Sequence, residues 1–164
     1  MSRRMLIMVA TIAGFVLLAA LLLFPMMTMK LGDETDSRRA IQDVAGPWLL
    51  LFGWIACAFS ALVFFGKADY IGVPESKSRM LSFLGYKLYG FFALALLIAG
   101  TPHEKASWGF GFWLAFLAAI VGALAVYLTF NPGLAQKIAD KAKEMKDGAG
   151  EDAAGPPDAG GSAP

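Results

Sequence analysis

The sequence predicts an all-α polytopic membrane protein: four transmembrane helices in an antiparallel bundle, then a short basic juxtamembrane helix and a disordered C-terminal tail. Hydrophobic residues make up 57% of the 164 residues and charged residues only 16%, which is unusual for a water-soluble domain. The apolar residues also gather in four blocks, three of which hold 25, 23 and 31 consecutive uncharged residues. The fourth contains Lys87 as its single charge. Because about twenty helical residues cross the hydrocarbon layer, each block is long enough to span it.

The first block predicts a helix over residues 5–28. It follows Arg3 and Arg4, so a cleaved signal peptide is an alternative, since signal peptides also begin with positive charge. The apolar run continues past the roughly 7–15 residues of a signal-peptide core, however. A retained transmembrane helix is therefore expected, with Pro25 near its far end.

The other three blocks predict helices over residues 46–66, 80–100 and 107–130. Pro47 suits a first helical turn, and Trp48 suits a membrane interface. Residues 30–45 are polar and are expected to form a loop, as are residues 67–79. Because only residues 101–106 separate the last two blocks, those helices are expected to form a tight antiparallel hairpin.

Beyond this four-helix domain, residues 1–131, the sequence changes character twice. The pair Asn131-Pro132 is typical of a new helix start. Residues 132–146 then place apolar and basic side chains largely on different sides, which predicts a basic amphipathic helix at the membrane surface. Residues 147–164 are rich in Gly, Ala, Pro and acid and lack branched apolar or aromatic residues, which predicts a disordered tail.

The basic residues that flank the spans predict the orientation, because such residues are enriched on the cytoplasmic side. With both termini in the cytoplasm, nine basic residues lie inside: Arg3, Arg4, Lys67, Lys77, Arg79, Lys137, Lys141, Lys143 and Lys146. Four lie outside: Lys30, Arg38, Arg39 and Lys105. Tyr70, Tyr86 and Tyr127 are then expected at the inner interface. A composition rich in Ala, Gly and Pro, with a single asparagine, favours a bacterial inner membrane.

Several kinds of chemistry find no support in the sequence. The net charge of +1 and the lack of a basic patch exclude nucleic-acid binding. The chain has one cysteine, Cys57, which excludes an intramolecular disulfide and a multi-cysteine metal site. It has one histidine, His103, which excludes bis-histidine haem ligation within this chain. No catalytic residue, metal ligand or cofactor is therefore predicted.

Small residues at helical spacing are the strongest packing signal, because they let a second helix backbone come close. One set lies in the last span: Gly111, Ala115, Ala118, Ala119, Gly122 and Ala123. A shorter set lies in the second span: Gly53, Cys57 and Ala61. Either these faces hold the four helices of one chain together, or they dock onto the helix of a partner subunit or a second copy.

Positively charged side chains are the candidates for lipid or partner contacts. Lys87 lies inside a span, where a charge is costly, so it either reaches back to the headgroups or meets an anionic lipid or a partner's carboxylate. Lys137, Lys141 and Lys143 follow the last span and are expected to attract anionic headgroups on the cytoplasmic side. Membrane lipids and other integral membrane subunits are the predicted partners.

Three functions are consistent with these features. The preferred one is a non-catalytic accessory, assembly or scaffolding subunit of a larger membrane complex, because the small-residue faces suit docking. The alternative is a small homo-oligomeric transporter or channel, in which either Lys87 would serve an anion path or the pore would be hydrophobic and need no charge. An enzyme that acts on lipid is the least favoured of the three functions. Its polar catalytic groups would be only His103, Glu104 and Asp33.

Overall fold

The computed structural model describes residues 2–31, 34–40, 45–100 and 106–151. This part of the chain is mostly helical. It contains four helices that are long and apolar enough to cross a membrane: α1 (Arg3–Leu23), α2 (Gly46–Phe64), α3 (Glu75–Ala99) and α4 (Phe110–Phe130). A short 3-10 helix, η2 (Ala68–Ile71), joins α2 to α3.

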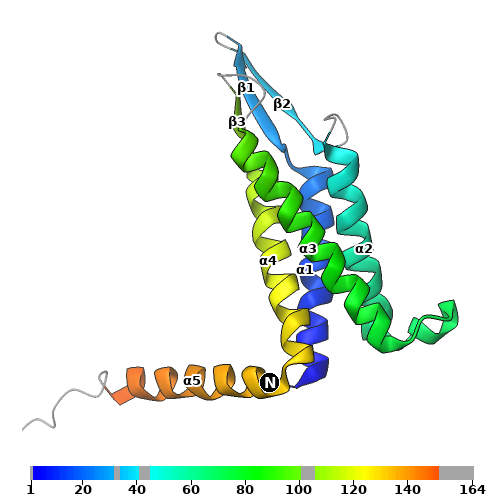
Figure 1. The fold of residues 1–164 in the computed structure, drawn as a ribbon. Helices are drawn as coiled ribbons and strands as arrows, with labels where there is room; N and C mark the ends of the chain where they lie inside the picture. Colours follow the sequence, from blue (N-terminus) through cyan, green and yellow to red (C-terminus); the bar gives the residue numbers. More distant parts are fainter. Residues whose placement is uncertain (1, 32–33, 41–44, 101–105, 152–164) are drawn as a thin grey trace, which may run out of the picture.

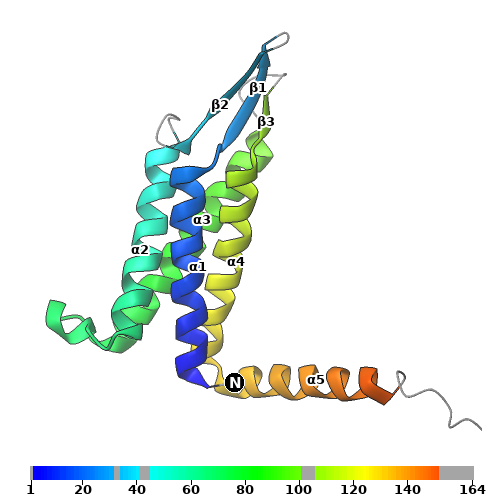
Figure 2. The same cartoon turned by 180° about the vertical axis from the view of Figure 1, so that it is seen from behind.

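The four long helices run antiparallel in a bundle (Figure 1). Seen from behind, α1 lies between α2 and α4 (Figure 2), and it contacts both. Helix α3 packs on α2 and, less extensively, on α4. The start of α1 and the end of α4 lie at one end of the bundle, which we call the base (Figure 1).

Small residues set how closely the helices approach. A side chain at Gly85 of α3 would collide with the backbone of Ala56 in α2, and one at Gly14 of α1 would collide with Cys57. The hydroxyls of Ser60 and Ser82 lie 2.5 Å apart, which links α2 to α3 a second time. The core is therefore held by close backbone contacts and a few buried polar groups.

A three-stranded antiparallel sheet projects beyond the end of the bundle opposite the base (Figure 1). Its strands are β1 (Met27–Leu31), β2 (Glu34–Arg38) and β3 (Ala106–Trp108), in the order β2-β1-β3. Met27 lies opposite Arg38 on one side and opposite Trp108 on the other. The loop expected over residues 30–45 thus contains most of a hairpin.

Several helix ends differ from the expectation. Helix α1 ends at Leu23 instead of residue 28, because Pro25 lacks an N–H and disfavours helical geometry at Phe24, which is extended. Helix α3 begins at Glu75 instead of residue 80, directly after Pro74. Helix α4 begins at Phe110, because Ala106–Trp108 pairs with β1.

The last helix, α5 (Pro132–Glu151), turns at the base and projects sideways away from the bundle instead of continuing the direction of α4 (Figure 1). Ala135 of α5 is buried with Leu6 and Leu128, which fixes the start of this helix against α1 and α4. Residues 147–151, expected to open the disordered tail, are the last residues of α5. Residues 152–164 of that predicted tail lie outside the described part of the chain.

Candidate functional site

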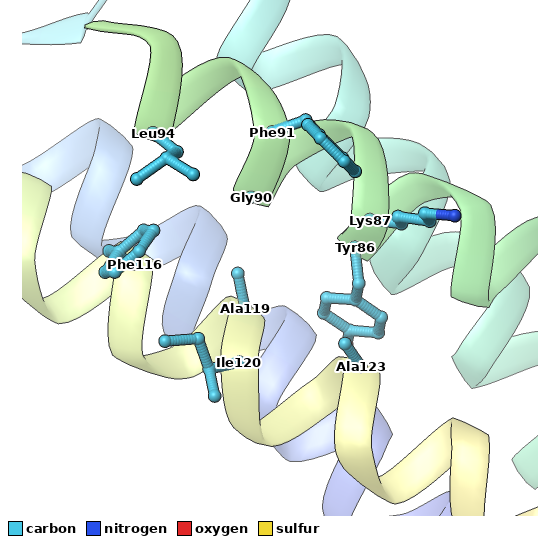
Figure 3. Close-up of a pocket in the computed structure, with 9 residues that line it drawn as sticks. All are labelled: Tyr86, Lys87, Gly90, Phe91, Leu94, Phe116, Ala119, Ile120 and Ala123. Carbon is cyan, nitrogen blue, oxygen red and sulfur yellow. The ribbon is translucent and has the colours of Figure 1, made fainter. Parts of the chain in front are cut away.

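A groove opens between α3 and α4 near the middle of the bundle (Figure 3), with a volume of about 270 Å³. Its lining is apolar apart from one lysine and one tyrosine. The contributing residues are Tyr86, Lys87, Gly90, Phe91 and Leu94 from α3 and Phe116, Ala119, Ile120 and Ala123 from α4. An apolar hollow of this kind suits a hydrophobic occupant such as a helix or an acyl chain.

The groove exists because α3 packs more extensively on α2 than on α4. Gly85 brings α3 against the backbone of α2. Gly90 lies five residues further along α3 and faces α4 (Figure 3). A Cβ at Gly90 would have no atom within 4 Å. The facing residues on α4, Ala119 and Ala123, are also small. The space between the two helices is therefore left unfilled by this chain.

Tyr86 closes one end of the groove and ties three helices together. Its side chain is 1% exposed, and its hydroxyl donates to the carbonyl of Ala10 in α1 at 2.5 Å. Its ring lies against Gly122 of α4, where any Cβ would collide with it. The interfacial position expected of Tyr86 is therefore wrong, because the side chain points into the core.

Lys87 lies at the rim of the groove and on the outer surface of α3. Its side chain is exposed and points away from the groove, and its ammonium lies 5.9 Å from the centre of the Phe91 ring (Figure 3). It lies about 18 Å of helical rise beyond the start of α3 at Glu75. Lys87 thus borders the groove without lining a path through the bundle interior of a single chain.

The small residues of α4 lie mostly inside the bundle. Gly111 lies against the carbonyls of Ala20, Phe24 and Pro25, at and just beyond the end of α1, and Gly122 meets Tyr86. Ala115, Ala118 and Ala119 are buried as well. Within this set Ala119 and Ala123 border the groove.

The shorter small-residue set of α2 also packs within the chain. A Cβ at Gly53 would collide with Leu17 of α1, and the buried Cys57 lies against Gly14. Ala61 is only partly buried. These contacts mean that most of both predicted docking faces is already covered by the chain's own helices.

The structure brings together only part of the predicted site. Lys87, Ala119 and Ala123 share the groove. Lys137, Lys141 and Lys143 are exposed on α5 at the base, away from it. Sequence reasoning missed Gly90. The signal that could have identified it is a glycine inside an apolar helix, which costs stability and often marks a place where another backbone comes close.

The polar groups considered for chemistry form no cluster that the structure describes. Within the described residues, no three His, Cys, Asp or Glu side chains come together as metal ligands would. His103, Glu104 and Asp33 lie outside the described residues. Comparison of the chain with protein-family models, with curated proteins and with solved structures gives no match.

Proposed function

We propose that this protein is an accessory, assembly or scaffolding subunit of a larger membrane complex, and that the groove between α3 and α4 receives a transmembrane helix of a partner subunit. In this proposal the four long helices span a bacterial inner membrane. Both termini are cytoplasmic.

The distribution of exposed side chains supports the membrane placement. Large apolar residues on the outer surface include Ile12, Trp54, Phe91, Ile98 and Leu117, each at least half exposed. Exposed apolar surface on this scale is costly in water and is expected against lipid or a partner.

The charges support the proposed orientation. Arg3 and Arg4 are the first residues of α1, Lys67 directly precedes η2, and the other basic residues of this group belong to α5. The start of α1, the connection from α2 to α3 and the start of α5 all lie at the base (Figure 1). Arg38 and Arg39 lie at the sheet end. Basic residues are thus concentrated at the end that holds the N-terminus, as expected for a cytoplasmic face.

The open space at Gly90 is the observation that carries the docking proposal. Membrane helices associate through small residues that allow close backbone approach, and Gly90, Ala119 and Ala123 provide three of them around one groove. Lys87 at its rim suits a partner carboxylate or a lipid phosphate. The transporter alternative stays a prediction. Lys87 lies on the outer surface of α3, and no contact among the described residues favours an anion path beside it.

A pair of substitutions on α3 tests the docking proposal. Gly90→Leu fills the groove, and the open space at Gly90 predicts that the bundle still folds. Ala95→Leu is the control, because Ala95 is exposed on the same helix and does not line the groove. We expect partner subunits to co-purify in mild detergent with the wild type and with Ala95→Leu, and to be lost with Gly90→Leu.

The readout includes helical content by circular dichroism, so that loss of folding is not mistaken for loss of docking. Equal co-purification with a folded Gly90→Leu variant would contradict docking in this groove. Recovery of only homo-oligomers from native membranes would favour the transporter alternative and direct attention to Lys87.

A further inference from the structure

A second cavity lies at the base, where α4 ends and α5 begins, and it has a volume of about 630 Å³. Four helices contribute to its walls. Arg3 and Leu6 come from α1, Arg79 from α3, Leu128 and Thr129 from the end of α4, and Asp140 from α5. The volume lies within the range of ordinary ligand sites, about 300–1,000 Å³.

The two arginines are held in place by different contacts. Arg3 forms an ion pair with Glu75, which ties α1 to the start of α3. Arg79 donates from Nη1 to the carbonyl of Thr129 at 3.4 Å, and its guanidinium carbon lies 5.1 Å from the centre of the Phe130 ring. A cation is favourable at this position, because the carbonyl end of a helix carries partial negative charge.

Arg79 keeps one donor without a partner. Its Nε is buried and makes no hydrogen bond with any described residue, and it lies 3.9 Å from the nearest oxygen of Glu75. The whole side chain is only 16% exposed. A buried guanidinium donor without a hydrogen bond is costly, so the contacts with Thr129 and Glu75 leave part of the hydrogen-bonding capacity of Arg79 unused.

The wall that α5 contributes carries a negative charge. Asp140 lines the cavity from α5, is exposed, and forms no ion pair with the described residues. One carboxylate, Glu75, pairs with both Arg3 and Arg79, so these three groups together keep one net positive charge, and Asp140 is the negative side chain that lines the cavity. The side chains of Lys137, Lys141 and Lys143 do not line it.

We propose that this cavity binds the headgroup of a zwitterionic phospholipid whose ammonium carries N–H groups, as in phosphatidylethanolamine. The phosphate accepts hydrogen bonds from Arg79, and the ammonium donates to the Asp140 carboxylate. Charge-assisted bonds of this type are stronger than neutral ones. Pro132 and Ala139, which line the cavity and are not fully buried, supply apolar surface beside the headgroup for the glycerol and upper acyl chain. An anionic headgroup without an ammonium would leave Asp140 facing negative charge.

This inference rests on the proposed membrane placement, because a lipid headgroup reaches the cavity only if the base lies at the bilayer surface. Extraction of native membranes with alkaline carbonate tests that placement separately. Release of the protein would overturn both proposals. Retention leaves the headgroup proposal to be decided by lipid selectivity.

Selectivity is measured on the purified full chain by native mass spectrometry. The probes are phosphatidylethanolamine, phosphatidylcholine and phosphatidylglycerol with identical acyl chains. We expect about tenfold tighter binding of phosphatidylethanolamine than of phosphatidylcholine, because methylation removes the N–H donors that Asp140 accepts. Asp140→Asn should bring this ratio close to one.

Asp69→Asn is the matched control, because Asp69 is an exposed carboxylate at the same end of the bundle that does not line the cavity. It should leave the ratio unchanged. Equal binding of the two zwitterionic lipids by the wild type would overturn the proposal. Tighter binding of phosphatidylglycerol, or a ratio that Asp140→Asn does not alter, would overturn it as well.

Discussion

At the scale of single residues, Tyr86 does more to organise the bundle than any charged side chain of the spans. It extends from α3, donates to α1 and packs against α4, so three helices meet at one side chain. Sequence patterning could not identify this role, because a tyrosine seven residues into an apolar block looks like an interfacial residue. Only the partner atoms, Ala10 and Gly122, which are distant in sequence, reveal it.

The Tyr86 hydroxyl provides a test of the packing. Tyr86→Phe removes the hydrogen bond to Ala10 and keeps the ring, so we expect the free energy of unfolding to fall by about 0.5–1.5 kcal/mol. Denaturation in detergent, followed by circular dichroism, measures this loss. Tyr127→Phe is the control, because Tyr127 is 43% exposed and should tolerate the change. Equal effects at both positions would count against a specific bond at Tyr86.

Two glycines with opposite surroundings give a second test. Gly122→Ala forces a methyl group into the Tyr86 ring, and overpacking of this kind typically costs about 1–3 kcal/mol. Gly90→Ala meets open space and improves helix propensity, so it should be neutral or stabilising by up to about 1 kcal/mol. Unfolding of both variants under the same conditions gives the comparison. If Gly90→Ala destabilised the protein as much as Gly122→Ala, the space beside Gly90 would be occupied and the open groove would be wrong.

At the scale of elements, the largest departure from the sequence prediction is the sheet. Pro25 ends α1 early, and the chain then pairs β1 with β2 nearby and with β3 more than seventy residues later. The long helices were predicted because twenty apolar residues are a strong local signal. The strands were not, since each is five residues or fewer and β3 depends on a distant partner.

Strand pairing and orientation can be tested together by a cross-link. Thr28 and Ser107 lie opposite each other on β1 and β3, with hydroxyl oxygens 2.9 Å apart. The double variant T28C/S107C should form an intramolecular disulfide in cells if the sheet end faces the oxidising periplasm. Cys57 is buried and should not compete. Electrophoretic mobility with and without reductant reports the bond.

The two single variants, T28C and S107C, control for intermolecular bonds. A disulfide that forms only after purification and added oxidant would place the sheet end in a reducing compartment, against the proposed orientation. Absence of the bond even with oxidant would contradict the pairing of β1 with β3.

At the scale of the whole molecule, apolar surface and charge are segregated along the bundle. Exposed bulky apolar residues lie along the four long helices. The basic residues of α5 lie at the base, from which this helix projects (Figures 1 and 2). The groove between α3 and α4 and the cavity at the base lie at different positions along the bundle axis. The apolar groove lies at mid-height, where a partner helix would pass, and the polar cavity lies at the base, where headgroups would be.

The sequence by itself determined the existence of four long apolar helices and a basic fifth helix, because hydrophobic runs and charge breaks are local properties of the chain. It also placed Lys87, Ala119 and Ala123 among the candidate residues. Only the tertiary structure decided that most small residues pack within the chain, that Gly90 leaves a groove, and that Arg79 faces a cavity with Asp140. Each of these features depends on which helices are neighbours in the bundle. Helical periodicity shows which residues share a face of a helix, but it does not identify the helix that packs against that face.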